Sequence, residues 1–116
     1  MDKVAQYRKI LVEVIEKYAA AGTPNKGQNP NALDIHLLFD RERDHYQVLG
    51  LGWRGDQQTC LVIFHFAIQD GKIWLHRNVS DYDILEDLEA SGVPKQDIVL
   101  AFQPPRIRQF TDYAVA

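Results

Sequence analysis

The most apolar stretch of the chain, Thr59 to Ile68 (TCLVIFHFAI), is followed by Asp70-Gly71 and then by a second apolar run, Lys72 to His76 (KIWLH). Two short apolar runs joined by Asp-Gly give the strongest short-range signal for a β-hairpin, because both turn positions need a positive φ. These residues therefore predict two antiparallel strands joined by a tight turn.

Two runs further upstream are also predicted to be strands. Leu33 to Phe39 alternates between apolar and polar positions, and His45 to Trp53 carries Gly50 and Gly52 on one side. Paired glycines within a strand are typical of a bulge or of close packing over the sheet. The four runs together predict an antiparallel meander. Its remaining predicted turns comprise residues 40–44 and 54–58.

A helix is predicted before the sheet and another after it. Apolar residues recur at three- and four-residue spacings ahead of Gly22 and predict an amphipathic N-terminal helix. Ser80 or Asp81 can cap a second helix that runs to about Ser91 and closes at Gly92. The apolar stripe of the first helix contains Val4, Tyr7, Leu11, Val14, Ile15 and Tyr18, with Ile10 beside it.

The remaining segments complete the predicted fold. Residues 23–32 are rich in Pro, Asn and Gly and form a predicted polar loop. Residues 97–102 (DIVLAF) fit either a short strand or a buried helical turn, because periodicity alone does not decide between them. The tail from 106 to 116 contains spaced apolar residues and is expected to dock. We therefore expect one α+β domain, 1–116, with a four-stranded antiparallel meander sheet, an N-terminal helix, a second helix after the sheet and a docked C-terminal tail.

The third predicted strand is apolar on both faces. A strand with one solvated face alternates apolar and polar residues, and this run does not. We expect helices to cover one face and the tail or a second subunit to cover the other, which predicts a homodimer or a higher homo-oligomer. Simple alternation places Cys60, Val62, Phe64 and Phe66 on one face and Leu61, Ile63 and Ala67 on the other.

Composition limits the classes of function. The chain is 46% hydrophobic and 25% charged, which is ordinary for a globular domain, and no apolar run approaches the roughly 20 residues of a membrane helix. Its beginning lacks the apolar core of a secretion signal, so we expect a cytoplasmic protein with no membrane association. Acidic residues outnumber basic ones by 16 to 13, which disfavours independent DNA binding.

No catalytic or metal-binding pattern is found. The four histidines, His36, His45, His65 and His76, are separated by 9, 20 and 11 residues, so no HxH or HxxxH pair anchors a zinc site. We expect them to be scattered, ordinary hydrogen-bonded residues, and Cys60 to be a buried inert thiol. Phosphate loops, nucleophile elbows and dinucleotide fingerprints are also lacking. The sequence therefore predicts no catalytic residue, no cofactor and no metal.

Two charged segments are candidate partner surfaces. The second helix is acidic, partly because a helix N-terminus favours negative charge, and it could face a basic partner. The tail combines arginines with aromatics, as nucleic-acid binders do, but two arginines add little affinity, so we expect them to meet acids of this chain or of another subunit. The candidate partner surface comprises Asp81, Asp83, Glu86, Asp87, Glu89, Arg106, Arg108, Phe110 and Tyr113.

Several segments of the chain form a recognisable pattern. They are residues 40–46 (DRERDHY), Gly52-Trp53 and 70–74 (DGKIW), and 92–102 (GVPKQDIVLAF) with Pro105, Arg108, Thr111 and 114–116 (AVA). Together they resemble the XisI-like family, the cyanobacterial excision-controlling factors named for the fdxN DNA element. The family commonly follows its tryptophan strand with a Gln-x-Asp-x-Thr-Glu-like segment, whereas residues 76–81 here read HRNVSD.

The resemblance implies a small α+β protein that works beside a site-specific recombinase and a companion factor when a programmed DNA element is removed. It implies no catalytic triad, cofactor or metal. We therefore expect a non-catalytic regulatory factor that acts through protein–protein contacts with the recombinase or the companion factor. The alternatives are an accessory protein that binds DNA directly and an unrecognised small enzyme.

Overall fold

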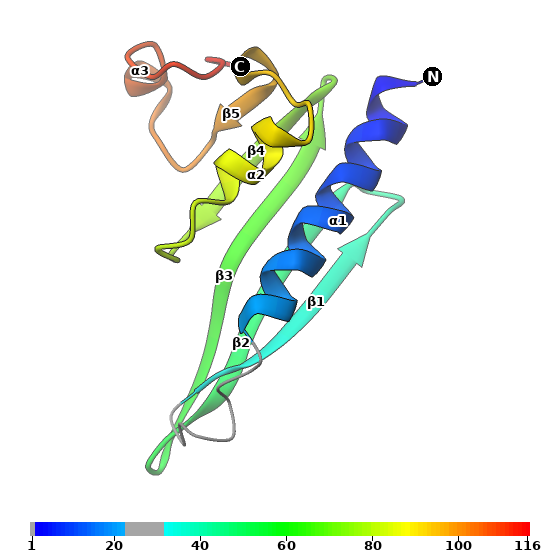
Figure 1. Cartoon of the computed structure of the whole chain (residues 1–116). Coiled ribbons are helices and arrows are strands. Elements are labelled where there is room, and N and C mark those ends of the chain that lie inside the picture. The colour runs from blue at the N-terminus through cyan, green and yellow to red at the C-terminus, as the bar shows by residue number, and fades with distance from the viewer. Residues whose placement is uncertain (1, 23–31) are drawn as a thin grey trace.

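The computed structural model describes residues 2–22 and 32–116, so nearly all of the predicted loop 23–32 lies outside the described residues. A long N-terminal helix lies across a twisted five-stranded sheet, and shorter elements gather at one end of it (Figure 1). The elements are α1 (Lys3–Gly22), β1 (Asp34–Asp40), β2 (His45–Arg54), β3 (Gln57–Gln69), β4 (Lys72–Asn78), α2 (Ile84–Ala90), the 3-10 turn η2 (Lys95–Asp97), β5 (Ile98–Leu100) and α3 (Pro105–Arg108).

The sheet is mixed, with the strand order β1-β2-β3-β4-β5. The first four strands form the predicted antiparallel meander. The predicted number of strands is wrong, because Ile98–Leu100 pairs in parallel with β4 and adds a fifth. A parallel strand needs a crossover connection, which α2 provides here. All three β5 residues are buried, and a run of three buried residues has no period from which a strand could be identified.

The tight turns follow the predicted chemistry. Asp70 and Gly71 have φ values of 55° and 75°, as the Asp-Gly signal requires. The other predicted turn, 54–58, is shorter than expected because Arg54 pairs with Gln57. The second helix is also shorter: it begins after Asp83 and not after Ser80 or Asp81, since the Asp83 side chain accepts from the backbone N–H of Glu86.

The core lies between the helices and one face of the sheet. The apolar stripe of α1 is confirmed, with Ile10 buried as part of the core and not merely beside the stripe. Side chains of this face bury their apolar surface against the sheet, which is the main favourable term in folding. No helix among the described residues is long and apolar enough to cross a membrane. Fully buried side chains include Leu11, Ile15, Tyr46, Val48, Phe64, Phe66, Leu75, Ile84, Leu88 and Ile98.

Gly50 and Gly52 permit close packing over the sheet, as predicted. A Cβ added at Gly50 would lie 2.8 Å from Cδ1 of Leu33, and one at Gly52 would lie 3.0 Å from Cδ2 of the same leucine. Any larger residue would therefore overlap the Leu33 side chain. The segment that enters β1 consequently lies directly on β2.

A β-bulge in β3 overturns the predicted assignment of its faces. Val48 pairs with Phe64 and Leu49 with Val62, so Ile63 is an additional residue in the ladder. Because adjacent residues of β2 point to opposite faces, Val62 and Phe64 do so as well. Periodicity cannot reveal such a shift. The prediction of a buried thiol fails for the same reason, since Cys60 is exposed.

The C-terminal tail docks as expected. The backbone N–H of Ala114 donates to the carbonyl of Ile98 at 2.9 Å, and Ala114 forms a β-bridge with Val99. The tail thereby borders β5 at one edge of the sheet. It covers the β4–β5 end of the sheet, whereas the helices cover the opposite face (Figure 1).

Candidate functional site

The acidic residues of α2 are partly engaged within the chain. Asp83 is the N-cap, and Asp87 accepts a hydrogen bond from the Tyr82 hydroxyl and forms an ion pair with Lys17 at 3.3 Å. The hydrogen bond to Asp87, followed by burial, raises the pKa of Tyr82 to about 12. Two of the five predicted acids therefore have structural roles.

Glu89 joins the acidic helix to the tail. The Tyr113 hydroxyl donates to Oε2 of Glu89 at 3.2 Å, and Nζ of Lys95 lies 3.8 Å from Oε1. Burial, with the neighbouring charge of Glu89, raises the pKa of Tyr113 to about 12. The Glu89–Tyr113 bond thus joins the two predicted segments. Their exposed side chains, Asp81, Asp83, Glu86, Arg106 and Phe110, are together called the α2–tail surface below.

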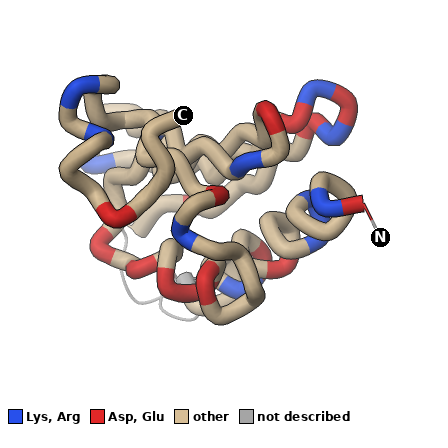
Figure 2. The backbone as a smooth tube through the Cα atoms, turned by 90° about the horizontal axis from the view of Figure 1, so that it is seen from above, with Lys and Arg blue, Asp and Glu red and all other residues tan. Residues whose placement is uncertain are grey.

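Among the described residues Arg108 bonds to backbone carbonyls and to no acid, and the expected contact with an acid of another subunit stays a prediction. Its guanidinium donates to the carbonyls of Gln103 at 3.0 Å and Ala101 at 3.3 Å, and it lies 5.6 Å from the centre of the Trp74 ring. The carbonyls of a turn without a regular ladder attract the guanidinium in place of a carboxylate. Figure 2 shows acidic positions following one another around α2, while basic positions are spread over several segments.

Three of the four histidines gather on the sheet face opposite the helices, contrary to the expected scatter. Nδ1 of His45 lies 3.0 Å from Nε2 of His65, and the rings of His65 and His76 are 5.4 Å apart. The antiparallel register places them together, because β2 and β4 both flank β3. Spacings of 9 to 20 residues along the chain gave no sign of this contact.

The part of this face on β1–β3 is called the open face below. A hollow of about 340 Å³ lies at the end of this face next to the β1–β2 turn. It is lined by Leu38, Phe39, Asp40, His45, Gln47 and His65. Burial, with the charges of His76 and His45, lowers the pKa of His65, and burial also lowers the pKa of His76. Both imidazoles therefore favour the neutral form. Representative side chains of the open face are Leu38, Gln47, Leu49, Trp53, Val62 and His65.

An enzyme would need a pocket that holds histidines and carboxylates able to transfer protons. The hollow meets this requirement only in part. Asp40 accepts from the backbone N–H groups of Glu42 and Arg43, at 3.1 and 3.0 Å, and these bonds lower its pKa. A carboxylate with a lowered pKa is a poor general base at neutral pH. The described residues contain no group of three or more side chains placed to hold a metal ion.

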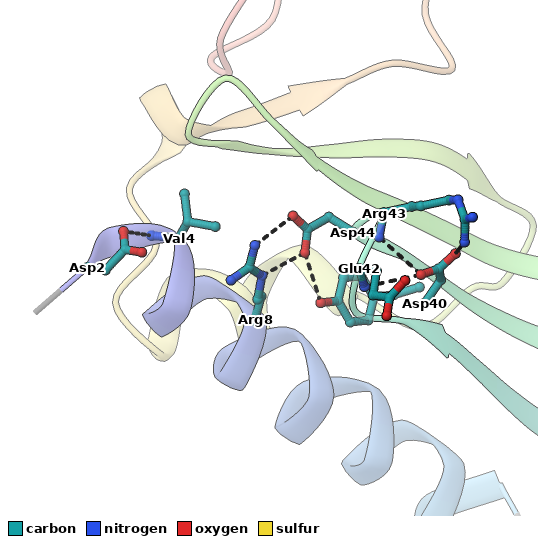
Figure 3. A network of polar contacts seen from close by, with 8 residues as sticks. Asp2, Val4, Arg8, Asp40, Glu42, Arg43 and Asp44 are labelled. Carbon is teal, nitrogen blue, oxygen red and sulfur yellow. Dashed lines mark hydrogen bonds and ion pairs between the residues drawn. The ribbon is translucent and has the colours of Figure 1, made fainter.

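A polar network anchors α1 beside this hollow (Figure 3). The Arg8 guanidinium donates two bonds to Asp44, at 2.7 and 3.0 Å, and lowers the pKa of that carboxyl. Asp44 also accepts from the Tyr46 hydroxyl at 3.3 Å. The sequence does not reveal this network, for which the only signal is a charged hairpin loop. The network fixes the β1–β2 turn, and with it His45, relative to the helix.

The fold and these surfaces define the class: a small α+β protein with one helix-covered sheet face, one open face and a charged α2–tail surface. The sequence pattern of the family described as "XisI protein" matches residues 1–115. The chain belongs to the XisI family, so the resemblance found in the sequence is confirmed. No curated protein sequence matches the chain.

Two solved structures share the fold over the whole chain. One is a XisI-like protein from Anabaena variabilis, with 37% identity, a TM-score of 0.84 and coverage of 99% of this chain and 100% of the relative. The other is the fdxN element excision controlling factor XisI from the same organism, with 32% identity, a TM-score of 0.79 and the same coverage.

Proposed function

We propose that this chain is a non-catalytic regulatory factor in the site-specific excision of a DNA element, and that it acts through contacts with a recombinase or a companion factor. The observation that carries the proposal is its membership of the XisI family, together with the whole-chain similarity to a protein named as an excision controlling factor. Family membership supports a role in the control of excision, and the exposure of Phe110 supports the choice of contact surface made below.

The α2–tail surface is the proposed contact region. Phe110 is 78% exposed, and a large exposed aromatic beside an arginine is typical of the residues that dominate binding energy. Arg106 lies on α3, and Phe110 follows two residues after the end of that helix. The tail is joined to α2 by the Glu89–Tyr113 bond. Charges of both signs around one aromatic suit a protein partner better than a uniformly negative nucleic acid.

The test is a binding measurement paired with an excision assay. The purified chain is titrated against the purified recombinase and, separately, the companion factor of the same cell. The double variant R106A and F110A is expected to weaken binding at least tenfold and to reduce excision of a reporter element. Phe102→Ala, at a residue that is 44% exposed outside the proposed region, is the matched control and should bind normally.

Two results would contradict the proposal. One is excision that proceeds equally with and without the chain. The other is a wild-type chain that supports excision but binds neither protein. Direct DNA binding is the competing outcome, and a salt-steep affinity for duplex DNA would identify it. Arg108 already serves its own tail, which leaves Arg106 as the free cation of the predicted pair.

A further inference from the structure

We propose that the open face is the interface between two copies of this chain, and that protonation of its histidine cluster opposes the association. The inference is independent of the proposed function, because it concerns the purified chain alone. The homodimer itself is predicted from the sequence. Its interface is assigned here to the open face, whose β3 residues depend on the bulge at Ile63.

The open face is uncovered within the single chain. The buried side chains of α1 and α2 pack on the other side of the sheet. The tail reaches only the β4–β5 end, where Arg108 lies over Trp74. Trp53 and Leu38 are consequently 56% and 51% exposed. Leu49, Leu51 and Val62 lie half-buried on the same face between them, and a contiguous apolar patch of this kind marks an interaction site.

The charges on this face favour a second copy as the occupant. Asp34 and Asp40 stand at the two ends of β1, and on the neighbouring strand β4 Lys72 is the first residue and Arg77 the last but one, so charges of both signs border the open face. Arg77 also bonds within the chain, because its Nε donates to the carbonyl of Val62 at 2.8 Å. A face bordered by both signs of charge offers little to DNA or to a strongly charged protein. It does match its own two-fold copy, with apolar residues at the centre and charges at the margin.

The area is sufficient for a weak or moderate dimer. β2 contains ten residues and is about 33 Å long, and three strands span about 14 Å across. The projected face is therefore on the order of 450 Å² per copy, and corrugated side chains add to it. Pairing two such faces would bury on the order of 1,000 Å², the lower bound of a biological interface.

The histidine cluster makes this interface sensitive to acid. Its members are His45, His65 and His76, and His65 Nδ1 also lies 3.4 Å from the Gln47 amide. The charged groups that face it are Asp40 from β1, Arg77 from β4 and Arg108 from α3. Asp40 is already paired with Arg43 at 3.1 Å, so the cations predominate. Protonating the imidazoles would add like charge on both copies and repel them.

Sedimentation equilibrium of the purified full chain at pH 8 and pH 5.5 tests both parts. We expect a dimer at pH 8 whose dissociation constant rises about tenfold or more at pH 5.5. Leu38→Lys should abolish the dimer at pH 8, whereas Val115→Lys, at an aliphatic residue of similar exposure (53%) in the tail, should leave it intact. The double variant H45Q and H65Q should form a dimer whose response to pH is largely lost, because His76 is then the only member of the cluster left to titrate. Circular dichroism checks that each variant is folded.

Each contrary result overturns a defined part. A chain that remains monomeric at pH 8 at high concentration overturns the interface. A dimer that tolerates Leu38→Lys shows that another face is used. A pH response that survives in the histidine double variant overturns the role of the cluster. None of these results bears on recombinase or companion-factor binding, so failure here is distinguishable from failure of the proposed function.

Discussion

Asp44 shows how one residue can serve both the backbone and a polar network. Its φ of 57° lies in the left-handed region, which Asp tolerates better than most residues and Ala disfavours. The same side chain accepts two bonds from Arg8 and one from Tyr46. Replacing it therefore changes backbone strain and the network together, and two substitutions are needed to separate them.

We predict that Asp44→Ala destabilises the fold by about 1 kcal/mol more than Asp44→Gly does. Both variants lose the bonds to Arg8, so the difference reports only the cost of placing a Cβ residue at positive φ. Urea denaturation of the two variants measures it. Equal unfolding midpoints would show that the turn relaxes out of the left-handed conformation.

His65 provides a prediction of pH dependence. Burial lowers its pKa below the ordinary 6.5, so the unfolded chain takes up a proton at a higher pH than the folded chain does. The stabilisation is fully present above pH 6.5 and decreases as the pH falls from there to the lowered folded value. The unfolding free energy should drop between about pH 7.5 and pH 5.5, and His65→Gln should flatten that drop.

The measurement uses urea denaturation in the Trp53→Lys background, which disrupts the open face far from the histidines and so keeps association from contributing. An NMR titration of the His65 ring in the same background gives the folded pKa directly. A value at or above 6.5 would contradict the assignment of the pH dependence to this residue.

Among the elements, α2 is short but contributes both to the core and to the connection of the sheet. It spans only Ile84–Ala90, yet it buries Ile84 and Leu88 and forms the crossover that allows β5 to pair in parallel with β4. Its start depends on one bond, from the Glu86 backbone N–H to Asp83. Loss of that cap should therefore weaken the strand that follows as well as the helix.

Asp83→Ala is expected to destabilise the chain by about 1 kcal/mol, whereas Asp83→Asn retains the cap and should cost much less. Hydrogen exchange should speed up at the amides of Val99 and Leu100 in the alanine variant, since β5 relies on the crossover. Unchanged exchange at β5 with a frayed α2 would show that the strand is held by β4 alone.

The elements also show which parts of the fold were predictable. The Asp70-Gly71 turn, the helix stripe and the meander all depend on local periodicity or turn chemistry, and they were predicted correctly. The Ile63 bulge and the gathering of His45, His65 and His76 depend on register between strands, which no local pattern contains. β5 was left open because its burial comes from contacts with distant parts of the chain. The acidic helix and the tail were recognised separately, but the Glu89–Tyr113 bond that joins them is tertiary.

At the scale of the whole molecule, α1 links the beginning of the chain to the residues that lead into β5. The Tyr7 hydroxyl donates to Asp97, ninety residues away, and Nζ of Lys3 lies 3.2 Å from the same carboxylate. Burial, followed by the bond to Asp97, raises the pKa of Tyr7. This contact holds the N-terminal helix to the entrance of β5 and so helps to unite the two halves of the fold.

Tyr7→Phe keeps the ring in the core but removes the bond, and we predict a loss of about 1–2 kcal/mol in unfolding free energy. Tyr18→Phe is the matched control, because the contacts of Tyr18 are made through its ring to Phe64 and Tyr82. Chemical denaturation of both variants provides the comparison. Equal stability of the two would show that water replaces the Tyr7 hydroxyl at no cost.

The docked tail affects how molecules of this protein can associate through the edges of their sheets at high concentration. Ala114 occupies the outer side of β5, so that side of the sheet cannot accept a foreign strand there. Within the described residues β1 is the other outermost strand, and it ends in Asp34 and Asp40. Two molecules that pair at β1 therefore form an edge-to-edge dimer, and strand addition at the β5 side would first have to displace the tail. The closing Ala-Val-Ala segment thus opposes repeated strand addition along the sheet.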